Sequence, residues 1–271
     1  MNDNFLINGQ LSSGLNPFDR GLAFGDGVFR TFMVLHGKPQ HWSYHEEILR
    51  HDANALGITI PPSKTLENDI EQLFPTEGAF IAKWIITRGY SERGYRIPKI
   101  IMPNRILLKS DYHPLALSVY EDGVTLEVST IPVASHLPLG PIKHLNRLDN
   151  VMAKEGLSAS MFDAIMLDDA GNVNECISHN IVARYGSTLH LPQQKKGGVS
   201  GASQQIILRH AKEIGYTCVP TTMSLATLFQ ADEIVITNAI NGAIPVKQIQ
   251  RKPWNSTKLA YDINTLFKKI K

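Results

Sequence analysis

Short apolar runs broken by turn residues fill most of the first part of the chain. "NFLI" and "QLSSG" flank Asn8-Gly9, a dipeptide that favours a tight turn between two strands. "VFRTFMVL" leads into a second turn at His36-Gly37-Lys38, and "AFIAKWIITRGY" and "RILLKSDY" are rich in apolar and β-branched residues. These segments are predicted to be strands, with the first four joined as hairpins.

A second pattern, with apolar residues several positions apart, marks helices. Within residues 43–58, Ile48, Ala55 and Leu56 recur at helical intervals, and the pattern stops at Gly57, a residue that commonly ends a helix. "QQIILRHAKEIG" is a second predicted helix and follows a glycine-rich turn. Strands interspersed with such helices predict the α/β class.

The pattern loosens around Pro114, which predicts a crossing between two α/β domains. We expect a small N-terminal domain over residues 1–114, a linker over 115–120, and a larger C-terminal domain over 121–271. After the crossing, "VTLEVSTIPV", "FDAIMLDDAGNVNECISHNIVARYGSTLHLP" and "ADEIVITNAINGAIPV" predict further strands and their turns.

The spacing of "PIKHLNRLDN" predicts a helix that begins near Lys143, with Leu145, Leu148 and Met152 on one face. A lysine at a helix start has its charged form disfavoured by the helix dipole and by apolar neighbours. The neutral amine suits Schiff-base or proton-transfer chemistry. A surface lysine beside a turn would give the same local pattern.

Composition excludes several classes of protein. With 43% hydrophobic and 19% charged residues the chain is globular rather than disordered, and a net charge of +2 gives no case for nucleic-acid binding. No apolar run approaches the roughly 20 residues of a membrane span. The start does not resemble a signal peptide, and the two cysteines are far apart, so we expect a cytoplasmic protein with reduced thiols. No set of residues with metal-ligand spacing is present, and no metal is expected.

Three further features could carry chemistry. Glu175 sits in a strand-like run, where a buried carboxylate would need a partner, although a strand carboxylate can also face solvent. "GGVSGAS" precedes a predicted helix and could hold a phosphate on free backbone N–H groups, although a loop that binds no ligand would have the same sequence pattern. "TRGYSERGYRIP" places Arg93 and Tyr95 in a basic loop that could bind a substrate carboxylate or lie solvated.

A reactive lysine, a buried carboxylate and a phosphate-binding turn form one chemical set. Pyridoxal 5'-phosphate uses all three, because it has an aldehyde, a ring nitrogen that is kept protonated, and a phosphate. The conjunction of the three features predicts this cofactor more strongly than any of them alone.

These residues resemble those of the fold-type IV pyridoxal-phosphate enzymes, the class IV aminotransferases, over nearly the whole chain. "DRGLAFGDGVFRT" is similar to the family's N-terminal signature, and "NECISHN" and "GVSGAS" follow in the family's order. The family includes branched-chain and D-amino-acid aminotransferases and aminodeoxychorismate lyases. "IKHLNRLDNVMAK", "RGYSERGY" and "ITNAINGAIPV" look most like the lyase branch.

The resemblance implies a two-domain mixed α/β fold, with a small α/β domain and a larger pseudo-barrel α/β domain, assembled as a homodimer. It implies pyridoxal phosphate as cofactor and a small carboxylate as substrate. In the lyase branch the product is 4-aminobenzoate for folate synthesis, and pyruvate is eliminated. An aminotransferase acting on branched-chain or D-amino acids is the alternative, and a non-catalytic homologue with weakened cofactor binding is a second one.

Residue by residue, the resemblance makes Lys143 the Schiff-base lysine and catalytic acid/base, and Glu175 the partner of the ring nitrogen. It implies that the turn formed by Gly201, Ala202 and Ser203 binds the phosphate. Substrate contacts are implied for four residues, namely Arg93, Tyr95, Thr31 and Arg30.

The chain departs from the family pattern at the first helix. Ile48 stands where members usually carry a phosphate-binding arginine, and Ala239 stands where aminotransferases carry a threonine. His45 and His51, three residues either side of Ile48, are expected to share its face and replace the arginine, with Asn238 as a further polar contact.

Overall fold

The computed structural model describes residues 4–11, 14–135 and 139–270, so Ser12 and Ser13 of the predicted second strand lie outside the described residues. The chain divides into two compact units. The first comprises residues 1–113 with 143–146, and the second comprises residues 114–142 with 147–271. Lys143, which the sequence prediction assigned to the C-terminal domain, therefore packs with the first unit.

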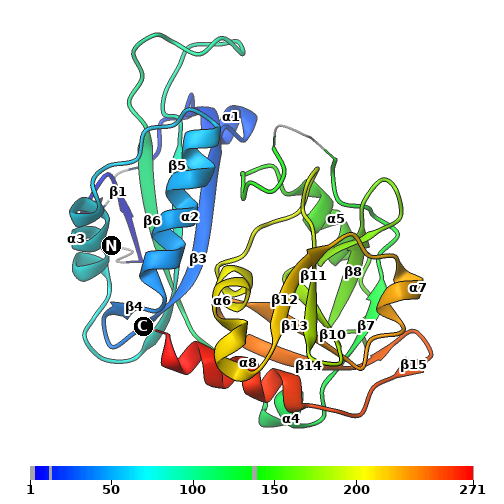
Figure 1. Ribbon diagram of the computed structural model, residues 1–271. Coiled ribbons are helices and arrows are strands. Elements are labelled where there is room, and N and C mark those ends of the chain that lie inside the picture. The colour runs from blue at the N-terminus through cyan, green and yellow to red at the C-terminus, as the bar shows by residue number, and fades with distance from the viewer. Residues whose placement is uncertain (1–3, 12–13, 136–138, 271) are drawn as a thin grey trace. The chain divides into compact units, whose positions relative to one another are not determined.

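An antiparallel sheet with the strand order β2-β1-β6-β5-β3-β4 forms the centre of the first unit (Figure 1). The predicted turns are confirmed, and Asn8 and Gly9 have φ angles of 54° and 82°, as a tight hairpin turn requires. The strands are β1 (Phe5–Ile7), β2 (Gln10–Leu11), β3 (Gly27–Leu35), β4 (Lys38–Pro39), β5 (Ala79–Thr87) and β6 (Asn104–Asp111).

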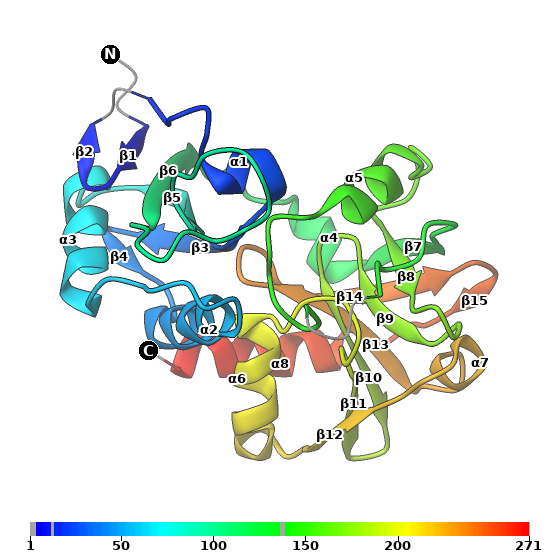
Figure 2. The ribbon, with the colours of Figure 1, turned by 90° about the horizontal axis from the view of Figure 1, so that it is seen from above.

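Helices α2 (Trp42–Ala55) and α3 (Ser63–Leu73) cover one face of this sheet (Figure 2). The covered face is formed by alternate strand residues, which are buried, and includes Val28, Phe32, Trp84 and Leu107. The prediction of α2 is confirmed, whereas α3 was not predicted although Leu66, Ile70 and Leu73 recur at helical spacing. A short helix, α1 (Arg20–Phe24), precedes β3.

The second unit is built on a larger sheet with the strand order β12-β11-β10-β13-β14-β7-β8-β9, and β15 pairs with β14. Its strands are β7 (Val124–Val128), β8 (Asp163–Leu167), β9 (Val173–Cys176), β10 (Asn180–Tyr185), β11 (Thr188–Pro192), β12 (Thr217–Thr221), β13 (Glu233–Asn238), β14 (Gly242–Ile249) and β15 (Lys252–Pro253). Its α-helices are α4 (Leu117–Glu121), α5 (Leu148–Glu155), α6 (Ala202–His210), α7 (Leu225–Leu228) and α8 (Lys258–Lys269), and the 3-10 helix η1 (Ala211–Ile214) follows α6.

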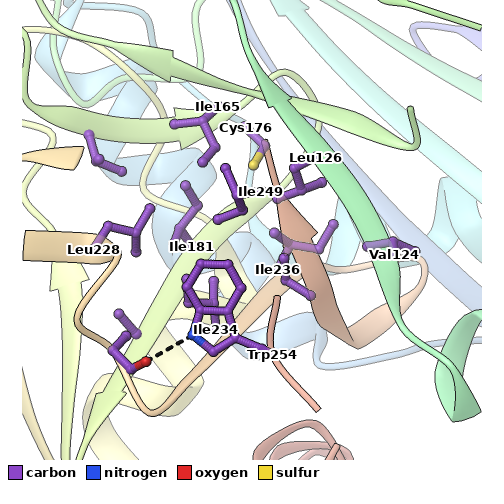
Figure 3. Packing of buried hydrophobic residues seen from close by; sticks show 14 of the residues in the cluster. Val124, Leu126, Ile165, Cys176, Ile181, Leu228, Ile234, Ile236, Ile249 and Trp254 are labelled. Atoms are coloured by element: carbon purple, nitrogen blue, oxygen red, sulfur yellow. Dashed lines mark hydrogen bonds between the residues drawn. The ribbon is translucent and has the colours of Figure 1, made fainter. Parts of the chain in front are cut away.

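The core of this unit is a cluster of branched aliphatic side chains contributed by several strands (Figure 3). Leu126, Ile165, Ile181 and Ile236 belong to it and are almost fully buried. Trp254 closes the cluster, and its indole N–H donates to the carbonyl oxygen of Ala231 at 2.8 Å, which satisfies its polar atom. The predicted mixed α/β class, with a small and a larger unit, is confirmed.

The predicted helix start at Lys143 is wrong. Helix α5 begins at Leu148, and His144 instead forms an antiparallel bridge with Val28 of β3. The amide of Phe29 donates to the carbonyl of Lys143, and the amide of Leu145 donates to the carbonyl of Gly27, both at 3.0 Å. These main-chain groups therefore form hydrogen bonds with a strand that is distant in sequence, instead of the hydrogen bonds of a helix. Because Lys143 is not at a helix start, the helix dipole does not act on it.

Among the helices in the described parts of the chain, none combines the length and the apolar character of a membrane span.

Candidate active-site residues

Lys143 lies at the edge of the first unit's sheet, and its main chain is held on both sides. Its N–H donates to Oδ2 of Asp52 on α2 at 3.1 Å, and its carbonyl accepts from Phe29. Its Nζ lies 4.7 Å from the centroid of the Phe29 ring, which gives a cation–π contact. Fixed main-chain bonds and an aromatic neighbour thus orient the predicted reactive amine.

The sheet face opposite α2 and α3 carries polar groups beside this lysine. Phe29 and Thr31 alternate with the covered residues of β3, so they lie on that face. Lys83 of β5 is directly opposite Thr31, and its Nζ lies 4.8 Å from the Phe29 ring centroid. The structure therefore brings Lys143 and Lys83 to one aromatic ring, on the sheet face that also carries Thr31.

Arg30 is placed on the other face. It is 2% exposed beneath α2, and its guanidinium forms an ion pair with Asp52, which is equally buried. Desolvation by burial lowers the pKa of Arg30, and the charge of Asp52 opposes this shift. The structure thus separates the two predicted substrate residues Arg30 and Thr31, and engages Arg30 with a partner inside the unit.

The two histidines proposed to replace the family's arginine do not share a face. His45 is buried in the same helical stripe as Ile48, whereas the side chain of His51 is 66% exposed and lies 3.2 Å from Oδ1 of Asp52. Six residues of an α-helix turn through about 600°, so the two side chains point about 120° apart. The expectation that both flank Ile48 on one face is wrong for His51.

His45 packs with its ring centroid 5.2 Å from that of Phe32, and its Nδ1 has no hydrogen-bond partner among the residues that the structure describes. Burial, reinforced by the positive charges of Arg30, His41 and Lys143, lowers the pKa of His45 well below its usual value. His45 is therefore a neutral imidazole, which could offer a phosphate a hydrogen bond but no charge.

The lowered pKa of His45 predicts acid sensitivity of the fold. Above pH 6.5 the imidazole is neutral in both states, and below it the unfolded chain binds a proton that the folded chain does not. The free energy of unfolding should then fall by about 1.4 kcal/mol per pH unit from this residue. In His45→Gln this part of the fall should be absent, as urea unfolding at neutral and acidic pH can measure. An unchanged acid dependence in the variant would contradict the assignment.

The loop that carries Arg93 and Tyr95 is anchored by Arg20 of α1. The Arg20 guanidinium donates to Ser91 Oγ at 3.1 Å and to the carbonyls of Gly94 at 3.2 Å and Tyr95 at 3.1 Å. The side chains of Arg93 and Tyr95 are exposed. The Tyr95 ring also packs against Phe24 of α1, with the ring centroids 5.3 Å apart. The loop thus has a fixed main chain at its tip and exposes the side chains of Arg93 and Tyr95, as a carboxylate-binding segment would need.

Glu175 lies in β9 of the second unit, where all four strand residues are buried. The predicted buried strand carboxylate is therefore confirmed. Its Oε2 accepts the N–H of Val199 at 2.8 Å, so it also ties β9 to the glycine-rich turn. The carboxylate is 4% exposed, an environment in which charge must be balanced by donors or a cation.

The glycine-rich turn packs closely against β9 and β10. A Cβ added at Gly201 would lie 2.1 Å from Oδ1 of Asn180, and one added at Gly198 would lie 2.0 Å from Oδ1 of Asn174. Gly201 is the N-cap of α6, and no side chain caps this helix start. Ala202 and Ser203 are buried in its first turn, so their amides lie at the positive end of the helix.

Asn238 ends β13 and holds the following turn. Its Oδ1 accepts from the amides of Ile240 and Asn241 at 3.0 and 2.8 Å, and its Nδ2 donates to the carbonyl of Ser178 at 3.2 Å. The structure thus engages both ends of this amide with the main chain of the second unit.

Three residues at these sites were not predicted from the sequence, namely Asp52, Lys83 and Arg20. Asp52 carried a usable signal, because a carboxylate in the apolar stripe of an amphipathic helix requires a buried partner. Lys83 interrupts an apolar strand but could equally face solvent, and the role of Arg20 depends on a loop distant in sequence.

Comparison with known proteins identifies the family. The model of the amino-transferase class IV family matches residues 27–249, most of the chain. The chain therefore belongs to the amino-transferase class IV family, whose members are pyridoxal-phosphate-dependent enzymes.

Individual relatives include both lyases and aminotransferases. An aminodeoxychorismate lyase of Vibrio harveyi is 28% identical and aligned over 98% of this chain and 97% of its own. A provisionally named branched-chain-amino-acid aminotransferase of Methanocaldococcus jannaschii is 30% identical over 95% of this chain and 90% of its own. The crystal structure of 4-amino-4-deoxychorismate lyase from Pseudomonas aeruginosa matches with a TM-score of 0.91 and 30% identity, over 98% of each chain.

Proposed function

We propose that this protein is a pyridoxal-phosphate-dependent 4-amino-4-deoxychorismate lyase, which converts its substrate to 4-aminobenzoate and pyruvate. The similarity to the Pseudomonas aeruginosa lyase over 98% of each chain carries the proposal. The Vibrio harveyi lyase supports it over nearly the same span. The product would enter folate synthesis.

The residues present fit this cofactor. The turn from Gly198 to Ser203 would hold the phosphate, since it offers helix-start amides that no side chain caps. The buried carboxylate of Glu175 would hold the protonated ring nitrogen, which would balance its charge. Lys143 would hold the aldehyde carbon covalently.

When bound, pyridoxal phosphate supplies a carbonyl for the substrate amine and a ring that accepts an electron pair. Lys143 Nζ is the proposed group that takes a proton from the substrate and returns one, because it is an amine held beside the Phe29 ring by a fixed main chain. Glu175, tied to Val199, is proposed to keep a proton on the ring nitrogen throughout turnover. Arg93 and Tyr95 are proposed to bind a substrate carboxylate.

The test is to incubate the purified protein with 4-amino-4-deoxychorismate and measure 4-aminobenzoate and pyruvate in equal amounts. Parallel reactions with pairs of branched-chain or D-amino acids and 2-oxo acids test the aminotransferase alternative, which the Methanocaldococcus jannaschii relative favours. Amino transfer without release of 4-aminobenzoate would decide for the alternative. Absence of both reactions with excess cofactor would leave the non-catalytic homologue.

A homodimer is also proposed, because the first unit exposes large apolar side chains. Tyr95, Ile100 and Met102 of the loop after β5 and Leu22 of α1 are each more than two-thirds exposed. A second copy of the chain is the proposed cover. Sedimentation should give twice the chain mass of 30.1 kDa, and Ile100→Glu should reduce it to the single mass. A single-chain mass for the unaltered protein would contradict the dimer.

The proposed location is the cytoplasm. Cys176 and Cys218 are free thiols, and a reducing compartment would keep them so. Recovery of the native protein in a membrane or secreted fraction would contradict this location.

A further inference from the structure

Asp52 occupies an unusual position for a carboxylate. It lies in the buried stripe of α2 together with His45, Ile48, Leu49 and Ala53, and its side chain is 1% exposed. Burial of a carboxylate is costly unless charge and hydrogen bonds are supplied to it. The partners of Asp52 therefore indicate why the position holds this residue.

One oxygen of Asp52 joins three separate segments. Oδ2 receives the guanidinium of Arg30 from β3, and the same oxygen accepts the main-chain N–H of Lys143 at 3.1 Å. Arg30 is buried on the covered face of the sheet, so the ion pair is shielded from water. The carboxylate links α2 and β3 to the segment that carries Lys143.

The segment from Lys143 to Asn146 has little local structure of its own. Its pairing with β3 comes from the Phe29–Lys143 and Gly27–Leu145 main-chain hydrogen bonds. Asp52 adds a side-chain acceptor at Lys143 itself. With its N–H and its carbonyl both bound, Lys143 directs its Nζ toward the Phe29 ring.

We propose that Asp52 and Arg30 are positioning residues for Lys143. Asp52 fixes the main chain of Lys143 through Oδ2, and Arg30 balances the charge of Asp52 so that this acceptor can remain buried. The proposal rests on the proposed function only in taking Lys143 as the reactive amine. Small displacements of a reacting group can lower a rate by about 100-fold, so such a clamp affects turnover more than substrate binding.

The test compares two double variants, Arg30→Met/Asp52→Asn and Arg30→Met/Asp52→Leu. Both remove the two charges together, which avoids leaving one of them buried alone. Asn and Leu are close to Asp in size, but only Asn keeps an oxygen that can accept the Lys143 N–H. The pair therefore isolates the acceptor.

The first measurement is hydrogen exchange of the Lys143 amide in the full-length protein, expressed relative to amides of β5, a strand that contains none of the altered residues. This ratio removes any general change in stability. Exchange in the Leu variant should be about tenfold faster than in the Asn variant, as loss of one hydrogen bond predicts. Equal ratios in the two variants would overturn the proposal, whatever the activity.

The second measurement is turnover of the cofactor-loaded variants. The Leu variant should show a kcat about tenfold or more below that of the Asn variant, with KM changed by less than about twofold. Faster exchange without any difference in kcat would show that fixing this main chain does not affect turnover, and would overturn the positioning role. The reactivity of the Lys143 amine is tested separately by Lys143→Ala, so the two ideas fail separately.

The matched control is Arg105→Met/Asp69→Leu. This second Arg–Asp pair joins β6 to α3 in the same unit, with Arg105 Nε 2.6 Å from Asp69 Oδ2 and Asp69 buried. Its removal should leave the exchange of the Lys143 amide and the kcat unchanged. If this control changed the exchange of the Lys143 amide and the kcat as much as the Leu variant does, loss of any buried Arg–Asp pair in the unit would be enough to produce the effect. That result would overturn the specific role of Asp52.

Discussion

Lys143→Ala should lack the visible absorption band of lysine-bound pyridoxal and should turn over substrate about 1,000-fold more slowly, or not measurably. The loss follows from removal of the only amine that the proposed mechanism uses. The variant should still fold, because the bonds from Lys143 to Asp52 and Phe29 involve its main chain. Absorption spectra with added cofactor and single-turnover kinetics measure the two losses.

Lys83→Ala is the matched control for the spectrum. Its ammonium lies beside the same ring as that of Lys143, at 4.8 Å from the Phe29 centroid, but on β5. The band should persist in this variant. If Lys143→Ala kept the band and Lys83→Ala lost it, the covalent role would pass to Lys83.

Glu175→Gln should lower kcat by about 100-fold or more while leaving the fold intact. A glutamine oxygen can still accept the N–H of Val199, so the turn should be retained, but a neutral amide does not hold a proton on the ring nitrogen. The proposed electron uptake by the ring would weaken accordingly. Turnover and thermal unfolding of the same preparation separate the two effects.

Glu233→Gln is the matched control, and it should affect stability rather than turnover. Glu233 is also a buried strand carboxylate of the second unit, but it pairs with Arg184 at 2.8 Å and accepts from the amide of Leu259. This variant should be less stable with an unchanged kcat. A similar fall in kcat for both variants would argue that Glu175 acts through stability alone.

Local patterns predicted much of the fold because they determine its elements. The hairpin at Asn8-Gly9 needs only two residues that accept positive φ, and α2 needs only an apolar stripe. The buried environment of Glu175 was likewise visible in its strand. In each case the decisive interactions lie within a few residues of one another or repeat along one element.

The segment around Lys143 could not be predicted in this way. Leu145, Leu148 and Met152 have helical spacing, but Leu148 and Met152 belong to α5 and are exposed, while Leu145 pairs with β3. The spacing of apolar residues carries no information about hydrogen bonds to a strand that is distant in sequence. The same limit hid the contact of Lys143 with Asp52, and it led to an argument from a helix dipole that does not act there.

The pairing of Lys143–Leu145 with Gly27–Phe29 also bears on how the protein matures during synthesis. Until the ribosome has released residue 146, this end of β3 remains an unpaired strand edge and Asp52 lacks one of its donors. Completion of the first unit must therefore wait for a late part of the chain. The nascent protein cannot acquire an ordered Lys143 before that point, so competence for catalysis arises only after the sheet's edge is protected.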